Sequence, residues 1–164
     1  MQMLSTTVSS SSPESQTLTD ALLRASRALE TVAARSLATI DSEVTLPQYR
    51  ALVVLASRGP RLVGQLADDL AVHASTATRL CDRLVAKKLV RRTVTRDNRR
   101  ETSIRLTAAG QHIVDRVTAI RRVEIGRIVR RIPASLRDST VVALSAFSAA
   151  AGEPADQSWL LGWS

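Results

Sequence analysis

The chain has 164 residues, 45% of them hydrophobic, so it can bury a core and is not disordered throughout. Aromatic residues make up only 2%, which disfavours recognition of single strands by base stacking. Arginines interrupt every apolar run before it reaches the roughly 18 residues that a membrane helix needs. The net charge of +8 favours a polyanionic partner. With no secretory signal and one cysteine, Cys81, we expect a cytoplasmic protein without membrane contact.

Residues 1–16 are rich in serine and threonine, which predicts a flexible arm. From Leu18 to about Asp41 apolar residues recur at helical spacing, which predicts a long amphipathic helix. We assign residues 17–44 to this helix and expect it to contribute to dimerisation.

Residues 45–106 have the pattern of a winged helix-turn-helix. A helix opens at Thr45, with Gln48 at capping-box spacing, and ends at the Gly-Pro pair 59–60. Two short helices, "LVGQLADDLAV" and "ASTATRLCDRLVAKKLV", follow on either side of a tight turn near His73. The residue types then switch to those of strands in "LVRRTVT" and "TSIRLT", which the polar "RDNRRE" joins. This switch predicts a two-stranded hairpin with a charged tip.

The two short helices should bury apolar faces with three- and four-residue spacing. The expected inner residues are Val63, Leu66, Ala67 and Leu70 in the first helix and Ala77, Leu80, Cys81 and Leu84 in the second.

Residues 107–164 are expected to form two C-terminal helices and a tail. Thr107 is the predicted N-cap of a long helix that continues to Ile132 and that Pro133 ends. A last helix is expected from about Ser135 to Ala151. The fold class is therefore mainly α, a winged helix-turn-helix with flanking dimerisation helices. Because these helices have more apolar surface than a small winged core could cover, we predict a homodimer.

The positive charge is concentrated in the second short helix and the hairpin. From Arg79 to Arg105 there are ten basic and three acidic residues, so this segment carries 10 − 3 = +7. A solvating coat of charge would be spread more evenly, and the concentration therefore favours a polyanion docking at this segment.

The helix over about 74–88 has the residues that a recognition helix needs. Small hydroxyl side chains near its start, Ser75, Thr76 and Thr78, would let the backbone approach the major groove. Arg79 and Arg83, one turn further on, could reach base edges and phosphates. The alternative is that the hydroxyl residues only start the helix and that the arginines are solvated. The neighbouring basic hairpin favours the DNA interpretation.

Further DNA contacts are expected beside this helix. The hairpin over about 91–105 would be a wing whose tip enters a minor groove, where negative potential is enhanced. The candidate tip residues are Arg96, Arg99 and Arg100. Candidate phosphate contacts are His73, Lys87 and Lys88, although His73 could equally only fill the turn.

We find no catalytic constellation, no phosphate-binding glycine loop and no motif for a cofactor, so we do not expect an enzyme. Asp68 and Asp69 are best explained as solvated or capping residues. His112 has no neighbouring ligand types and is expected on a surface or an interface rather than at a metal site. Cys81, on the inner face of its helix, is more simply a buried small hydrophobe than a redox sensor.

The segment from "LADDLAVHASTATRLCDRL" to "VRRTVTRDNRRE" and "LTAAG" resembles the MarR family of bacterial transcriptional regulators. The resemblance extends over roughly residues 45–117. "STATRLCDRL" is similar to the family's recognition helix, and the arginine-rich hairpin is similar to its wing. The resemblance implies a homodimer that binds pseudo-palindromic operator DNA, usually represses, and is often released by a small aromatic or phenolic effector. The sequence identifies no effector-binding residue.

One departure from the family concerns the wing, which usually carries Asp-x-Arg. Counting back from Thr107 places Asn98 at the acid position and Arg100 at the arginine position. The frame Asp97-Asn98-Arg99 also fits, shifted by one residue. Arg99 or Arg100 is therefore the minor-groove candidate, and we favour Arg100.

Two other functions remain open at this stage. The winged fold could present its basic face to an acidic protein, as an interaction module. It could also coat DNA without sequence preference, as an architectural protein, although coating needs only charge and does not explain the hydroxyl residues of the recognition helix.

Overall fold

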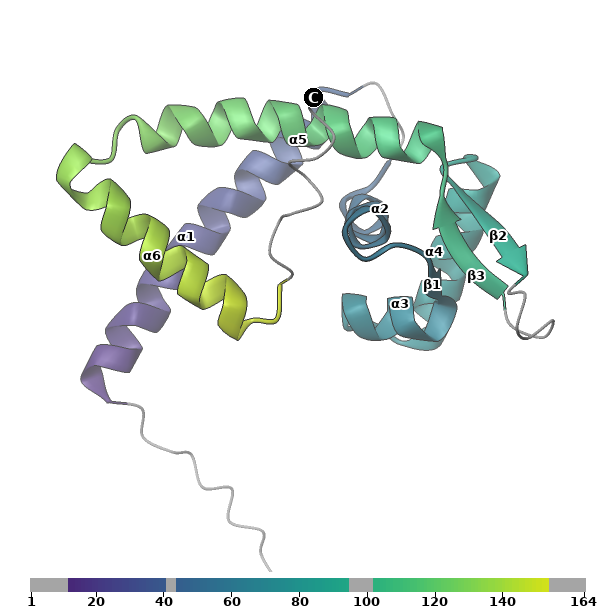
Figure 1. Ribbon diagram of the computed structural model, residues 1–164, viewed down its shortest axis with the longest axis horizontal. Coiled ribbons are helices and arrows are strands. Elements are labelled where there is room, and N and C mark those ends of the chain that lie inside the picture. The colour runs from purple at the N-terminus through teal and green to yellow at the C-terminus, as the bar shows by residue number, and fades with distance from the viewer. Residues whose placement is uncertain (1–11, 41–43, 95–101, 154–164) are drawn as a thin grey trace, which may run out of the picture.

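The computed structural model describes residues 12–40, 44–94 and 102–153 (Figure 1). Within these ranges the elements in chain order are α1 (Pro13–Ala38), α2 (Leu46–Arg58), β1 (Arg61–Leu62), α3 (Val63–Leu70), α4 (Ala74–Ala86), β2 (Val90–Val94), β3 (Thr102–Leu106), α5 (Ala108–Val129) and α6 (Ala134–Ala150). The predicted winged helix-turn-helix with flanking helices is confirmed.

Helix α5 is the long axis of the molecule. Its first turns lie beside α2 and the sheet, while its far end leads into α6, and α1 crosses it between these two ends (Figure 1). The winged domain therefore lies at one end of α5 and the remaining helices at the other.

The core lies inside the winged domain, where α2, α3, α4 and the first turns of α5 meet the sheet. All the residues expected on the inner face of α4 are buried, and so are Leu66, Ala67 and Leu70 of α3. Val63, at the start of α3, is only half-buried. The regularly spaced apolar residues of both helices thus pack into the core, and the opposite faces of the helices are exposed to solvent.

The sheet has a third strand that the sequence did not predict. Strand β3 lies between β2 and β1, and both pairings are antiparallel, with Val90 opposite Leu106 and Arg61 opposite Ile104. Ile104 is fully buried at the centre of this sheet. A strand as short as β1 has no periodicity of its own and forms only because β3 offers it an edge.

A dense set of backbone contacts joins α4, the wing and α5. The helix α4 ends with Lys88 in the left-handed region, at φ 59, and the Leu89 N–H donates to the Leu84 carbonyl at 3.0 Å. The Leu89 carbonyl accepts from the Thr107 N–H at 3.1 Å and from the Thr107 hydroxyl at 2.9 Å. As predicted, Thr107 also caps α5, since its oxygen accepts from the Gly110 N–H at 3.1 Å.

Helix α1 begins earlier than the sequence indicated. Ser12 is its N-cap and accepts from the Ser15 N–H at 3.3 Å, and Pro13 has the fixed φ that suits a first turn. Residues 13–16 are therefore helical, whereas we had expected them in the flexible arm. The rest of that arm, residues 1–11, lies outside the described residues.

The outer helices are much less buried than the winged domain. No residue of α6 is buried, and Val142 and Phe147 remain 70% and 50% exposed. In α1 the first buried residue is Val32. Many large apolar side chains of these two helices are thus exposed in the part of the chain that the structure describes.

The α4–wing–α5 junction predicts opposite effects for two glycine substitutions. A Cβ on Gly110 would lie 2.2 Å from the Leu89 carbonyl oxygen, whereas one on Gly64, in α3, would meet nothing within 4 Å. Gly110→Ala should therefore lower the free energy of unfolding by about 1–3 kcal/mol or more. Gly64→Ala should leave it unchanged or raise it by about 0.5–1 kcal/mol. Urea denaturation of both variants measures this, and equal stabilities would contradict the close packing at Gly110.

Candidate nucleic-acid interface

Helix α4 separates a buried face from a polar outer face. Ala77, Cys81 and Leu84 pack into the core. The five residues predicted to contact the major groove, Ser75, Thr76, Thr78, Arg79 and Arg83, are all exposed. Helical geometry brings Ser75, Thr76, Arg79 and Arg83 onto one side of the helix, and Thr78 lies at the edge of that side.

The hydroxyl groups at the start of α4 are not equally available. Thr78 donates its hydroxyl proton to the Ala74 carbonyl at 2.9 Å, so it partly serves the helix itself. Ser75 and Thr76 make no side-chain hydrogen bond within the described ranges. They present unused donors and acceptors at the end of the helix where a groove would be approached.

The two arginines of this face are also uncommitted. Neither Arg79 nor Arg83 pairs with an acid among the described residues. The acid on the same side of the helix, Asp82, forms an ion pair with Arg92 of β2. Asp82 is thereby paired with the wing, and the guanidinium groups of Arg79 and Arg83 have no acidic partner among the described residues.

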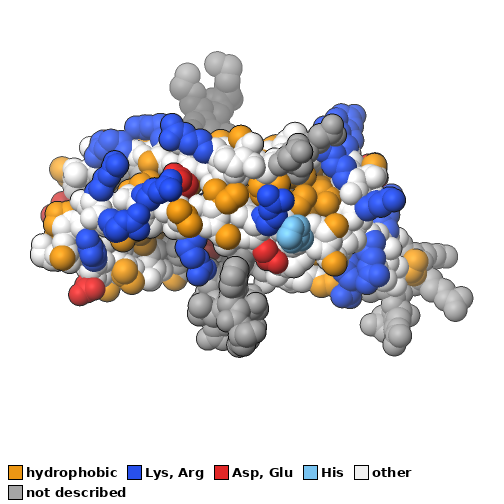
Figure 2. All heavy atoms as spheres, turned by 90° about the horizontal axis from the view of Figure 1, so that it is seen from above, with side chains coloured by type: hydrophobic (Ala, Val, Ile, Leu, Met, Phe, Trp, Pro, Cys, Tyr) orange, Lys and Arg blue, Asp and Glu red, His pale blue; other side chains and the backbone are white. Residues whose placement is uncertain are grey.

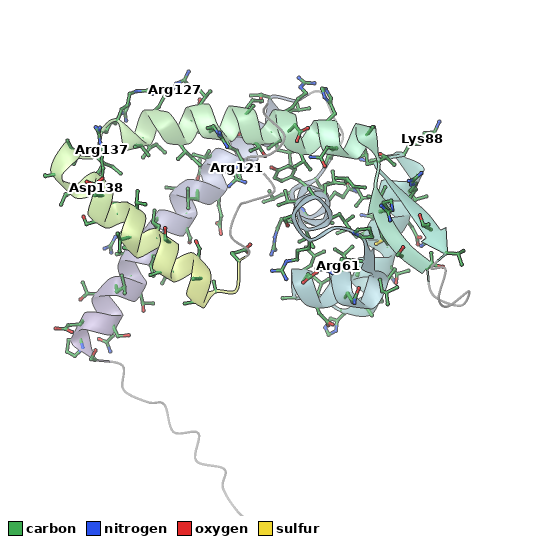
Figure 3. All side chains as sticks on the ribbon, in the orientation of Figure 1. Arg61, Lys88, Arg121, Arg127, Arg137 and Asp138 are labelled. Atoms are coloured by element: carbon green, nitrogen blue, oxygen red, sulfur yellow. The ribbon has the colours of Figure 1, made fainter. Side chains whose placement is uncertain are left out.

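The three predicted phosphate contacts lie in different environments. His73 is the exposed N-cap residue of α4, and its carbonyl accepts from Thr76 and Ala77. Lys87 is half-buried and donates to the Gln48 side-chain oxygen at 3.4 Å. Lys88 is exposed and projects from the end of α4 into solvent (Figure 3). Lys88 is therefore the most accessible of the three.

The wing strands carry exposed basic side chains on both sides of the hairpin: Arg91, Arg92 and Arg105. Arg91 and Arg105 face each other in the β2–β3 register. The predicted tip residues Arg96, Arg99 and Arg100 lie outside the described residues, so the choice between Arg99 and Arg100 stays a prediction.

Comparison with known proteins agrees with this geometry. The sequence profile of the MarR family matches residues 42–101. The crystal structure of RV1404 from Mycobacterium tuberculosis is 41% identical, with a TM-score of 0.81, and the match covers 90% of this chain and all of that one. The chain belongs to the MarR family of transcriptional regulators.

Two more distant similarities extend the comparison of this MarR-family chain. The uncharacterized HTH-type transcriptional regulator YpoP of Bacillus subtilis is 32% identical over 75 residues, which are 46% of this chain and 53% of YpoP. The match thus spans about half of that relative. A mutant of MepR from Staphylococcus aureus, solved bound to an oligodeoxyribonucleotide, shares the fold with a TM-score of 0.58 at 21% identity, over 81% of this chain and 96% of that one.

An ion-pair cluster that the sequence did not reveal fixes the first helix of the helix-turn-helix. Asp69 of α3 bridges Arg58 of α2 at 2.9 Å and Arg61 of β1 at 3.1 Å. Arg61 lies between α2 and α3 (Figure 3). Arg58 also donates to the Gly152 carbonyl at 3.3 Å, which links α2 to the residues after α6. We had expected Asp69 to be solvated or capping; no sequence pattern places these distant arginines beside it.

A second basic segment was also overlooked in the sequence. Residues 116–137 contain seven arginines and a single acid, Glu124. The face of the molecule above α5 shows many Lys and Arg side chains toward the α5–α6 end (Figure 2). Residues 106–164 together contain seven basic and five acidic residues, a net charge of 7 − 5 = +2. Because this net charge is small, it does not indicate the local concentration of arginine.

Two further titratable residues, His112 and Cys81, were considered as candidate functional residues in the sequence. His112 is exposed on α5, and the described residues contain no group of three or more His, Cys, Asp or Glu side chains that could hold a metal ion. None of the described helices is long and apolar enough to span a membrane. Cys81 is fully buried, and its burial raises the pKa of its thiol above the usual value.

The buried thiol should be chemically silent in the native protein. Its burial keeps reagents away from the sulfur, and its raised pKa lowers the fraction of reactive thiolate at neutral pH. A maleimide should therefore label Cys81 much more slowly in the folded protein than in about 6 M urea. Labelling at the same rate in both would contradict the burial and would reopen a redox role for this residue.

Proposed function

We propose that this MarR-family chain is a homodimeric regulator that binds pseudo-palindromic operator DNA and represses transcription. The observation that carries the proposal is the outer face of α4, where two exposed hydroxyl groups are followed by two guanidinium groups that have no acidic partner among the described residues. This combination suits a helix that lies in the major groove.

Each side chain of this face has a distinct role in the proposal. Ser75 and Thr76 are short and allow the N-terminal turn of α4 to enter the groove. Arg79, one turn later, is long enough to donate to a guanine edge, while Arg83 and Lys88 contact phosphates. Thr78 and His73 support these contacts from the edge. Lys87, which already faces Gln48, is the weakest of the phosphate candidates.

The wing supplies the contact with the neighbouring minor groove. Its strands extend from the end of α4, and the Asp82–Arg92 ion pair ties one of them to the recognition helix. We propose that Arg100, or Arg99 in the alternative frame, enters the minor groove and that Arg96 contacts the backbone beside it.

The apolar surfaces that are exposed in the described part of the chain support a homodimer. The exposed apolar residues of α6 and of the first half of α1 need a partner, and a second copy supplies matching surfaces by symmetry. Two recognition helices related by a two-fold axis would read two inverted half-sites. The MepR structure bound to an oligodeoxyribonucleotide shows that a protein of this fold can engage DNA.

We also propose that a small aromatic or phenolic effector releases the DNA. The observation in favour is Tyr49 of α2, whose buried hydroxyl has no hydrogen-bond partner among the described residues. A buried orphan hydroxyl is costly, and a ligand that bonds to it would be favoured.

The recognition-helix assignment predicts how two substitutions differ. Arg79→Ala should weaken binding to the preferred operator by about 1–3 kcal/mol and relax the preference at one base pair of each half-site. Lys88→Ala should weaken binding to all duplexes alike and reduce the salt dependence. Titrations of operator and scrambled duplexes at several salt concentrations measure both effects.

Arg24→Ala is the matched control, because it removes one positive charge from α1, outside the winged domain. If Arg79→Ala changed affinity and preference no more than Arg24→Ala does, the assignment of α4 as the recognition helix would be wrong.

A further inference from the structure

We propose that the outer face of α5 holds a second segment of double-stranded DNA, apart from the segment that the recognition helices contact. This face lies outside the helix-turn-helix and the wing, so its use would go beyond operator binding. From Arg116 to Arg131 the chain contains six arginines and one acid, Glu124, and carries 6 − 1 = +5. Such a concentration of one sign of charge favours a polyanionic partner.

Exposed residues form a continuous stripe along this face, the α5 stripe. It consists of His112, Arg116, Ala119, Val123, Arg127 and Arg130, which recur at spacings of four, three, four, four and three residues. Val123 follows the fully buried Val114 by about two and a half turns and is therefore on the opposite side of the helix. Arg121 lies on the side of α5 that faces α1, whereas Arg127 of the stripe points away from it (Figure 3).

The acids near the α5 stripe already have partners. Glu124 is paired with Arg127, and Asp115 accepts from the Gln111 side chain at 2.8 Å. The exposed arginines on and beside the stripe that have no acidic partner among the described residues are Arg116, Arg122, Arg130 and Arg131. Figure 2, which looks onto this side of α5, shows many more Lys and Arg than Asp and Glu side chains. The face therefore presents uncompensated positive charge to solvent.

A structural role at the end of the helix explains only part of this charge. Basic side chains near a helix C-terminus are favoured by the helix dipole, which suffices for Arg130. Arg137 also donates to the carbonyls of Ile132 and Arg130, at 3.1 and 3.4 Å. Arg116 and Arg122 lie further inside α5, beyond the range of this effect. Solvation does not require one sign of charge either, since α1 has three basic and three acidic residues.

The composition of the α5 stripe favours DNA over an acidic protein or a lipid surface. A helix of another protein, or a membrane, would need a broad apolar face to bury. Between Arg116 and Arg127 the stripe offers only Ala119 and Val123, of which Val123 is 55% exposed. Sequence-independent DNA binding needs only positive groups that reach phosphates, and a guanidinium group can donate two hydrogen bonds to one phosphate.

The length of the charged face suits a long anion rather than a small one. At a rise of 1.5 Å per residue, Arg116 and Arg131 are about 22 Å apart along the axis of α5. A DNA duplex carries about 13 phosphates over this length, so several can approach the arginines of one chain. Each copy in the proposed homodimer has this face, and a dimer on its operator would therefore bridge to further DNA.

Two-colour fluorescence cross-correlation tests for this bridging. The full-length dimer is mixed with an equal amount of its labelled operator and with a second duplex of unrelated sequence in another colour, at about 100 mM salt. The wild-type chain should make the two duplexes diffuse together. Arg116→Gln combined with Arg130→Gln should lower the bridged fraction at least about fivefold, because each chain loses two uncompensated charges. The operator Kd should change by less than about twofold.

Arg24→Gln combined with Arg50→Gln is the matched control, because it removes the same charge from exposed positions of α1 and α2. Glutamine is a good helix former, so neither pair should disturb its helices. The control should bridge within about twofold of the wild-type chain. Equal losses for the two pairs, or no bridging by the wild-type chain, would overturn the proposal. So would co-diffusion of the operator with labelled polyglutamate in preference to the second duplex, which would indicate an acidic protein.

Lengthening the operator identifies the source of the second segment. If DNA beside the operator bends onto α5, about 30 added base pairs on each side should lower the operator Kd several-fold for the wild-type chain but not for Arg116→Gln with Arg130→Gln. An unchanged Kd with persistent bridging means that the α5 stripe takes a separate duplex. Either result supports a second DNA surface.

The outcome is separable from that of the proposed function. A dimer that binds a specific operator but never bridges two duplexes refutes only the second surface. A dimer that bridges duplexes of any sequence and prefers none refutes only the operator-binding role.

Discussion

The Leu89 carbonyl is the point at which the recognition helix, the wing and the long helix α5 are joined. It accepts both the backbone N–H and the hydroxyl of Thr107, and Gly110 lets the first turn of α5 lie directly against it. The residue before it, Lys88, is in the left-handed conformation that ends α4 and turns the chain into β2. The direction in which α4 presents its outer face is thereby set relative to α5. Because α5 continues to the uncovered end of the molecule, the same contacts set the spacing between two recognition helices in the proposed dimer.

The arginines of α4 and the wing strands have different surroundings from those of α5. Those of α4 and the wing strands belong to the winged domain, where the one acid on the outer side of α4, Asp82, is paired with Arg92. Of those in α5, Arg121 and Arg122 line an apolar groove, and the buried Nε of Arg121 has no acceptor among the described residues. Exposed guanidinium groups beside small hydroxyl residues suit a nucleic acid. Net charge alone does not distinguish these two settings.

Much of the fold could be predicted from the sequence because its signals are local. The periodicity of α3 and α4 and the cap at Thr107 each depend on residues within a few positions of one another, whereas α5 ends at Val129, three residues before the predicted Ile132. Strand β1 was missed because it exists only through its pairing with β3, and the Asp69 cluster because it joins three elements. In the candidate site, helical spacing was enough to place Ser75, Thr76, Arg79 and Arg83 on the outside. It could not show that Lys87 faces Gln48 or that Arg92 pairs with Asp82, since both contacts arise from tertiary packing.

The central claim is that the outer face of α4 reads a DNA sequence as part of a dimer. The most direct measurement is selection of bound duplexes from a random pool by the purified protein at about 150 mM salt, where non-specific attraction is already weakened. The account predicts enrichment of an inverted repeat whose half-sites lie about one helical turn apart. A folded, dimeric protein that enriches no sequence would contradict it, and would favour an acidic protein or DNA of any sequence as the partner of the basic face.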